Sequence, residues 1–270
     1  MLKIFYGSAL SILFFVLIGL TPTVAHAATY TVTKNTDTAD GTCDSDCSLR
    51  EAVTAANSGG VDTIVLPANT YHITRSGAGE DLNVTGDFDF LDADLTTVTG
   101  ADMATTIIDS DDLDRAFHIA SGARATMSGV TVNDSSVTSA NGGGVLNEGS
   151  LVFSHVTIQN SVLDNPSGII SQYGAGIYCA AGDITLTDVT VSGNMSADPG
   201  VQTVFGGGIG ISGDCTSDIS RTIISGNSAA SGGGMFIDTN TTTTNTLTDV
   251  EFTNNTAAVD AGGGLSGSGP

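Results

Sequence analysis

A glycine-rich phrase that returns five times constrains the fold of this 270-residue chain more than any other feature. Its copies begin at Gly142, Gly174, Gly206, Gly232 and Gly262, and each runs into an apolar residue. The third glycines stand at positions 144, 176, 208, 234 and 264, so the copies are 32, 32, 26 and 30 residues apart. Periods of this length are typical of proteins that stack one short unit on the next. The sequence therefore predicts a solenoid.

The segments between the glycine phrases have the pattern of short β-strands. Residues 151–158 and 184–191 alternate apolar and polar side chains, and one added residue, His155 or Asp188, switches the phase midway. Each copy thus predicts two strands joined by a bend, and the glycine phrase supplies a third. We expect an all-β, right-handed parallel β-helix. The alternation places Ile184, Leu186, Val189 and Val191 inward and Thr185 and Thr190 outward.

Stacking gives a structural role to a column of asparagines. Asn194, Asn227 and Asn255 each close one of the alternating segments. Side-chain amides stacked about 4.8 Å apart can hydrogen-bond along the coil. We interpret these three residues as a structural ladder.

The bend positions form a second column, which contains Gly129, His155, Asp188, Arg221 and Asp249. This order puts Arg221 between two aspartates and His155 beside one, within reach of charge-assisted hydrogen bonds. A basic residue on such a coil can also serve as the base of a polysaccharide lyase. We favour a neutralised stacking position for Arg221 and keep the lyase base as the alternative.

The first 27 residues have the features of a secretory signal peptide. A short apolar stretch follows Lys3, and Ala25-His26-Ala27 is typical of a cleavage site. A transmembrane anchor is the alternative, although the apolar stretch is short for a span. We expect export to the cell surface, the outer membrane or the medium.

Four cysteines in an exported chain favour disulfides over metal or catalytic thiol sites. Cys43 and Cys47 are close enough in sequence to form a local bridge. Cys179 and Cys215 fall in successive repeats, but they stand 15 and 12 residues before Asn194 and Asn227. Because disulfide geometry is strict, the sequence leaves this second bridge open.

The charge of the chain limits its partners. The formal net charge is -22 at pH 7, and loss of Lys3 with the signal peptide makes it -23. Nucleic acid and anionic lipid need lysine and arginine for binding, so the chain is expected to bind neither. We expect a monomer that does not insert into a membrane after cleavage. A polysaccharide or another cell-surface ligand is the expected partner.

A short amphipathic helix is predicted before the repeats, over residues 49–57. Ser48 and Glu51 form a capping box, and Gly59-Gly60 follows the helix. An open end of a β-helix would expose apolar core and unpaired strand edges. We therefore expect this helix to cover the N-terminal end of the coil, which gives Arg50 and Glu51 an architectural role.

A family resemblance rests on the motif C-S-L-R-E-A at residues 47–52 and on the segments around it. These are Cys43 before the motif, and D-T-I-V-L-P at 62–67, G-D-F-D at 86–89 and D-R-A-F at 114–117 after it. It is similar to the N-terminal CSLREA domain of bacterial exported β-helix proteins, over residues 30–120. The later coils resemble the pectate-lyase-like (pectin lyase-like) superfamily and, less closely, the repeats of polymorphic outer-membrane proteins. The resemblance implies a cap with first coils at 28–120 and β-helix repeats at 121–270. Since the chain stops within a repeat, we expect further sequence beyond Pro270.

Function is less constrained than fold. The stretch from Glu80 to Asp114 and the acids around Cys43 are candidate calcium ligands, with solvated acidic loops as the alternative. No cofactor and no catalytic residue stands out, because every recurring residue has a stacking role. We expect an adhesin-like or carbohydrate-contacting scaffold without catalysis of its own. The alternative is a polysaccharide lyase or glycoside hydrolase, which an exposed groove with aspartates and an unpaired lysine or arginine would favour.

Overall fold

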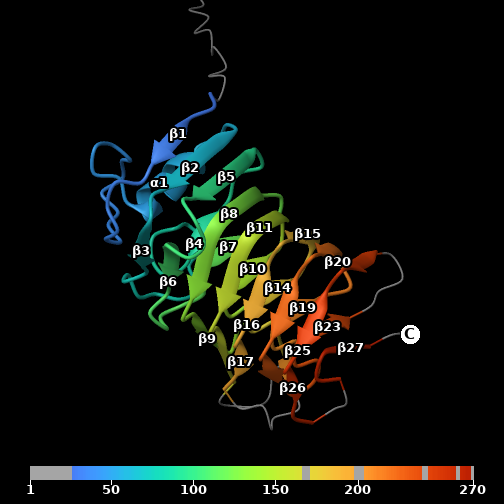
Figure 1. Cartoon of the computed structure of the whole chain (residues 1–270). Coiled ribbons are helices and arrows are strands. Elements are labelled where there is room, and N and C mark those ends of the chain that lie inside the picture. The colour runs from blue at the N-terminus through green and yellow to red at the C-terminus, as the bar shows by residue number, and fades with distance from the viewer. Residues whose placement is uncertain (1–25, 166–170, 198–203, 239–242, 260–261, 269–270) are drawn as a thin grey trace, which may run out of the picture.

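The computed structural model describes residues 26–165, 171–197, 204–238, 243–259 and 262–268. The chain forms about seven turns of a parallel β-solenoid with one α-helix near its start. Figure 1 shows the strands of successive turns side by side along the coil. The predicted all-β parallel β-helix is therefore confirmed. The predicted signal peptide lies almost entirely outside the described residues.

Four parallel sheets share these strands. The 13-stranded sheet holds β1 (Thr29–Thr31), β2 (Asp62–Leu66), β3 (Asn69–His72), β5 (Leu95–Gly100), β6 (Thr106–Asp109), β8 (Arg124–Asn133), β11 (Ser150–Gln159), β15 (Gly182–Thr187), β16 (Thr190–Ser192), β20 (Cys215–Ser220), β21 (Ile223–Ser225), β24 (Asn245–Thr248) and β25 (Glu251–Thr253). The seven-stranded sheet holds β4 (Phe88–Phe90), β7 (Phe117–Ile119), β10 (Val145–Asn147), β14 (Ile177–Cys179), β19 (Ile209–Ile211), β23 (Met235–Asp238) and β27 (Leu265–Ser268).

A further short strand follows in each of five turns, so the expected three strands per turn were too few. These strands are β9 (Ser136–Thr138), β12 (Val162–Asp164), β17 (Met195–Ser196), β22 (Ser228–Ala229) and β26 (Thr256–Ala257). The fourth sheet is the pair β13 (Gln172–Tyr173) and β18 (Val204–Phe205). With two or three residues each, all these strands are too short to show a periodic pattern in the sequence.

The core lies inside the coil, where the alternation predicts it. Ile184, Leu186, Val189 and Val191 are buried, whereas Thr185 and Thr190 are partly exposed on the outer face. The phase switches at the bend because its residues adopt left-handed backbone conformations. The φ angles at this column are 54° for His155, 57° for Asp188, 47° for Arg221 and 54° for Asp249, with 67° at Gly129.

The asparagine ladder is present. The Asn194 amide donates to Asn227 Oδ1, and the Asn227 amide donates to Asn255 Oδ1, each at 3.0 Å. The glycine phrase makes this ladder possible, because a Cβ on Gly208 would lie 3.0 Å from Asn227 Nδ2 and 2.5 Å from the carbonyl oxygen of Gly234. A methyl group has no room at that position.

Helix α1 (Leu49–Ala56) begins with the predicted capping box and ends one residue before the predicted end. Leu49, Ala52 and Val53 join the apolar core, so the helix covers the first turns of the coil. Arg50 is fully buried: its guanidinium binds both carboxylate oxygens of Asp37 at 2.6 and 3.1 Å and stacks over the ring of Phe88. The architectural interpretation of this motif is thus supported by its contacts.

Both cysteine pairs form disulfides, Cys43–Cys47 and Cys179–Cys215. Two disulfides fit an oxidising environment. Among the described residues, no helix combines the length and apolar character that a membrane crossing requires.

Candidate functional site

The outer face of the seven-stranded sheet carries one column of residues in register. It runs through Asp89, His118, Leu146, Tyr178, Gly210 and Phe236. The residues before and after each of them on the same strand point into the core. Because side chains alternate along a strand, the side chains of this column point outward. Acidic and imidazole groups stand at its N-terminal end and aromatic rings at the other. The two ends therefore differ in chemistry.

His118 is the centre of the polar end. Its Nδ1 lies 3.0 Å from Asp89 Oδ1 and 3.7 Å from Asp81 Oδ1, and its Nε2 lies 3.3 Å from Glu148 Oε2. Burial alone would lower the pKa of His118, but its hydrogen bonds to Asp89 and Glu148 and the charge of Asp87 raise it. These spacings of 29 and 30 residues match one turn of the coil. Sequence reasoning missed the group because the first turns lack the glycine phrase that aligns the later ones.

Acids predicted as calcium ligands or solvated loops are in part buried beside this group. Asp87 and Asp114 are each 1% exposed, and Arg115 forms an ion pair with Asp87 at 3.1 Å. Burial raises the pKa of Asp87 to about 7, against the opposing charge of Arg115. One oxygen of each carboxylate, Asp87 Oδ1 and Asp114 Oδ2, has no partner among the described residues. A solvated loop is therefore the wrong description of these two acids.

The acids around Cys43 have structural partners instead. Asp37 holds Arg50, Asp46 pairs with Lys34 at 3.0 Å, and Asp40 accepts the amide of Thr42 within its own turn. These contacts occupy carboxylate oxygens that a calcium ion would need.

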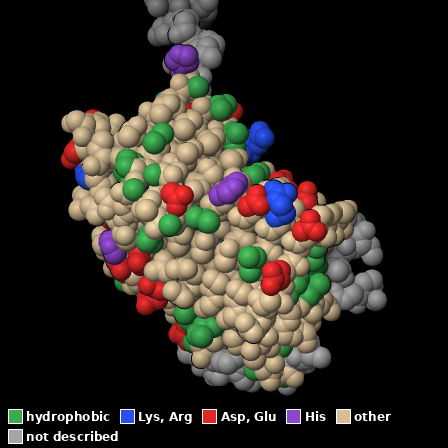
Figure 2. Space-filling model, in the orientation of Figure 1, with side chains coloured by type: hydrophobic (Ala, Val, Ile, Leu, Met, Phe, Trp, Pro, Cys, Tyr) green, Lys and Arg blue, Asp and Glu red, His purple; other side chains and the backbone are tan. Residues whose placement is uncertain are grey.

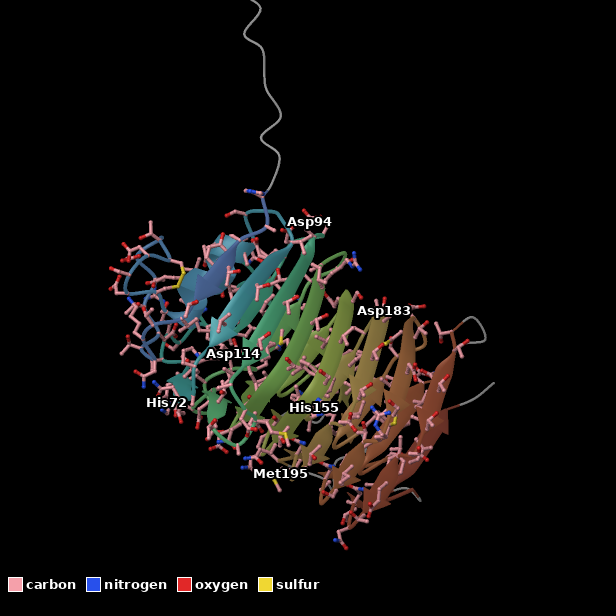
Figure 3. All side chains as sticks on the ribbon, turned by 45° about the horizontal axis from the view of Figure 1, so that its top comes forward. His72, Asp94, Asp114, His155, Asp183 and Met195 are labelled. Atoms are coloured by element: carbon pink, nitrogen blue, oxygen red, sulfur yellow. A yellow bond between two sulfur atoms is a disulfide. The ribbon has the colours of Figure 1, made fainter. Side chains whose placement is uncertain are left out.

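A groove of about 520 Å³ opens at the corner where the seven-stranded sheet passes to the 13-stranded sheet. Glycines at the corners of three successive turns, Gly122, Gly149 and Gly182, are among the residues that line it. Three of the polar residues that line it stand in register on β8, β11 and β15: Arg124, Ser150 and Asp183. In Figure 3, Asp183 and Asp94 lie at the same end of the strands. Glu148 also lines the groove, so it connects the groove to His118.

Arg124 differs from most other basic residues of the described chain. Lys34, Arg50, Arg115 and Arg221 each form an ion pair with a carboxylate, whereas Arg124 is exposed and no described carboxylate pairs with it. The groove therefore combines an unpaired guanidinium with Asp183 and Glu148. The sequence contained the glycines and Arg124, but nothing in it indicated that they share a groove.

In the bend column, Arg221 forms the expected ion pair with one of its two neighbouring aspartates. Arg221 binds both oxygens of Asp188 at 2.7 and 2.8 Å, and His155 Nε2 lies 3.9 Å from Asp188. No ion pair joins Arg221 to Asp249 among the described contacts, so Arg221 pairs with the aspartate of one neighbouring turn and not with both. Figure 2 shows a basic side chain flanked by acidic ones on this face, and hydrophobic side chains scattered singly.

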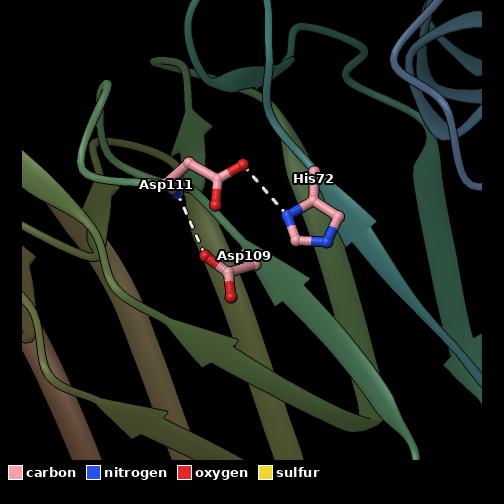
Figure 4. A group of neighbouring side chains, drawn as sticks. All are labelled: His72, Asp109 and Asp111. Carbon is pink, nitrogen blue, oxygen red and sulfur yellow. Dashed lines mark hydrogen bonds and ion pairs between the residues drawn. The ribbon is translucent and has the colours of Figure 1, made fainter.

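The residues around His118 and a separate group at the ends of β3 and β6 both contain possible metal ligands. His72 Nδ1 lies 2.9 Å from Asp111 Oδ2, and Asp109 Oδ1 accepts the Asp111 amide at 3.0 Å (Figure 4). The other oxygen of Asp109 accepts from the Asn133 side chain at 3.2 Å. Both Asp109 oxygens are therefore engaged within the protein, and His72 and Asp111 are about half exposed. This group is more open than the one around His118.

Aromatic rings gather at the other end of the outer column. Tyr173 stacks on Tyr178 and on Phe205 with ring centroids 5.4 and 5.3 Å apart, and Phe205 lies 4.8 Å from Phe236. Gly210 lies between Tyr178 and Phe236 in the register, and its missing side chain leaves room for Tyr173. The sequence did not reveal this cluster, because its members come from different strands of three turns.

Comparison with known proteins identifies no relative, since no family model, no curated protein and no solved structure matches the chain. The resemblance to CSLREA-domain, pectate-lyase-like and polymorphic outer-membrane proteins stays a prediction. The fold is shown by the structure, and a proposal about function rests on the candidate site alone.

Proposed function

We propose that this protein is an exported β-helix scaffold that binds a polysaccharide in the corner groove and has no catalytic activity of its own. The observation that carries the proposal is the groove lining. Arg124, Ser150 and Asp183 repeat at intervals of one strand, about 4.8 Å, along the coil axis. A polymer lying along that axis would meet one polar side chain at each turn. An adhesin-like role at the cell surface would use such a surface.

The groove chemistry suits a neutral saccharide. The Arg124 guanidinium donates hydrogen bonds, the Asp183 and Glu148 carboxylates accept them, and a sugar ring offers hydroxyls for both. A volume of about 520 Å³ lies within the usual range of small-molecule sites. The chain as a whole carries a net charge of -22, which disfavours an acidic polymer.

The contacts of Ala28 support the proposed export. The Ala28 amide donates to Asp62 Oδ1 at 2.7 Å, and β1 begins at the next residue. Cleavage after Ala27 would place a new α-ammonium group against this buried carboxylate. The two disulfides agree with an oxidising compartment.

Binding of the purified protein to a panel of neutral and acidic polysaccharides tests the proposal. We expect saturable binding to neutral chains that weakens at least fivefold in Arg124→Ala and in Asp183→Asn. Arg221→Ala is the matched control, because it removes the same charge from an exposed ion pair outside the groove. Binding that is absent from the panel, or that is equal in all three variants, would refute the groove as the site.

A glycoside hydrolase is the second candidate. Glu148 and Asp183 line one groove, and the Asp89–His118 pair stands behind Glu148. Paired carboxyls are what hydrolysis of a glycosidic bond requires. Release of new reducing ends that disappears in Glu148→Gln would favour this function over the scaffold.

A further inference from the structure

Asp89 and His118 stand directly opposite each other on β4 and β7. Although both point to the outer face of the sheet, they are 0% and 6% exposed. The segment that precedes β4 covers them: the Asn83 amide donates to Asp89 Oδ2 at 2.8 Å. A carboxylate and an imidazole are thus enclosed side by side outside the apolar core.

The same segment adds a third ligand. One carboxylate oxygen of Asp81, one of Asp89 and one ring nitrogen of His118 all lie within 4.8 Å of one another. The ring nitrogen nearest both carboxylates is Nδ1. The Asp81 side chain is 70% exposed, which provides a path from solvent to this point. Three donor atoms from three segments therefore converge on one position.

The two enclosed ligands are held by outer partners. The second oxygen of Asp89 is occupied by the Asn83 amide, and His118 Nε2 faces Glu148 Oε2 at 3.3 Å. With a proton on Nε2, His118 donates to Glu148 and presents the lone pair of Nδ1 to the cluster. A carboxylate behind a ligating histidine is the common outer arrangement of protein metal sites, because it fixes the ring and its tautomer.

The charge around this position is independently unbalanced. Asp87 and Asp114 are buried next to the cluster, each with one oxygen that has no partner among the described residues. Arg115 is the cation that faces them, through its ion pair with Asp87. Buried carboxylates in excess over cations are costly unless a proton or a positive ion compensates them.

We propose that Asp81, Asp89 and His118 bind a divalent transition-metal ion of the Zn²⁺ type, with Glu148 orienting His118. An imidazole with two carboxylates suits Zn²⁺, whereas Ca²⁺ prefers six to eight oxygen ligands. Three protein ligands leave the fourth position of a tetrahedral site open to water. This site is distinct from the saccharide-binding role of the groove, although Glu148 borders both.

The test is titration of the purified, metal-stripped protein with Zn²⁺, followed by calorimetry and by the melting temperature. We expect one saturable site and a rise in melting temperature, because an ion that binds the folded state stabilises it. Asp81→Asn should weaken binding at least tenfold. Since this side chain is 70% exposed and its ion pair among the described residues is the one with His118, we expect the variant to fold.

Three comparisons make the outcome decisive. Asp214→Asn removes the same charge from an exposed position and should bind Zn²⁺ as the unmodified chain does. Glu148→Gln should weaken binding about 10- to 100-fold. Asp111→Asn, in the group around His72, should leave binding unchanged. Absence of saturable Zn²⁺ binding, equal affinity in Asp81→Asn, or loss of the site in Asp111→Asn would overturn the proposal.

Discussion

Ser48 satisfies several backbone groups at the start of α1. Its hydroxyl accepts the Glu51 amide at 3.1 Å and donates to the Thr38 carbonyl at 2.7 Å, while the Glu51 side chain accepts the Ser48 amide at 2.8 Å. Ser48 is fully buried, so water is not available as a substitute partner. Loss of one hydroxyl therefore affects the helix and the loop before it together.

Ser48→Ala is expected to lower the free energy of unfolding by about 1–2 kcal/mol, the upper range for a helix cap. For a domain of this size that corresponds to a fall of roughly 2–8 °C in melting temperature. Ser45→Ala is the control, because Ser45 is exposed and its side chain has no described contact. Equal melting temperatures for the two variants would contradict the capping role.

The contribution of Glu51 to the stability of the helix cap depends on pH. Burial alone would raise the pKa of Glu51, but hydrogen bonds from the Ser48 and Asp40 amides and the Thr38 hydroxyl, with the charge of Lys34, lower it below its ordinary value of 4.5. A carboxyl whose pKa is lower in the folded state stabilises the fold above 4.5, and this contribution is lost as pH falls through the folded pKa.

Melting curves of the unmodified chain and of Glu51→Gln check this linkage. Glutamine keeps an acceptor for the capping box but carries no charge. The variant should melt lower at neutral pH, and the difference should shrink as pH falls below 4.5. A difference that stays constant from neutral pH to well below 4.5 would assign the effect to shape and not to charge.

At the scale of elements, the asparagine ladder joins successive turns. Asn227 is its middle member: it accepts from the backbone and side-chain amides of Asn194 and donates to Asn255 and to the Val191 carbonyl. Asn255 makes fewer buried contacts because it is partly exposed. A substitution at Asn227 therefore leaves more buried hydrogen-bonding groups without a partner than a substitution at Asn255.

Asn227→Ala is expected to cost about 2–4 kcal/mol, since buried donors and acceptors left without partners cost about 1–3 kcal/mol each. Asn255→Ala should cost less, because water reaches part of that site. Denaturant unfolding of both variants measures the order. The ladder would lose its assigned role if Asn255→Ala proved the more destabilising change.

The two disulfides close loops of different length. Cys179 and Cys215 are separated by 36 residues, and Cys43 and Cys47 by 4. In the chain-entropy description, removal of the longer loop constraint costs about 4 kcal/mol and of the shorter about 2 kcal/mol. The double variant Cys179→Ala/Cys215→Ala should thus unfold at lower denaturant than Cys43→Ala/Cys47→Ala. The reverse order would show that local strain, and not loop closure, governs these bridges.

The second disulfide also shows where sequence reasoning ends. Cys179 closes β14, whereas Cys215 opens β20 of the next turn, so the bridge crosses a corner between two sheets. This explains the unequal distances of the two cysteines from Asn194 and Asn227. Alignment of repeats predicts columns of equivalent positions across successive turns, but it does not predict contacts across a corner between two sheets.

For the same reason, the fold could be predicted from the sequence but the candidate sites could not. The glycine phrase and the alternation predict the coil, its core and the ladder because these features repeat. Asp89 and His118 come from early turns without the phrase, and Asp81 comes from a covering segment that has no repeat, whereas Glu148 follows the first copy of the phrase. Their meeting depends on the path of that segment, for which the sequence carries no periodic signal.

At the scale of the whole molecule, the charge distribution makes a lyase acting on acidic polysaccharides an unfavourable use of this coil. Lyase chemistry needs a base near the abstracted proton and positive charge at the substrate carboxylate. Arg50 is buried, and Arg115 and Arg221 are paired with aspartates. Arg124 is the unpaired cation in the groove, and Asp183 and Glu148 share that groove with it. An anionic chain would therefore meet net negative charge.

We expect the purified protein to form no unsaturated uronate from pectate or alginate, with or without millimolar calcium. The ultraviolet absorbance of the unsaturated product measures this directly. Calcium is included because a bound cation can reverse the local charge and bring an anionic substrate into the groove. Steady product formation that is lost in Arg124→Ala would identify the groove as a lyase active site. Loss in Arg221→Ala instead would place the active site on the bend column, where Arg221 is held by Asp188.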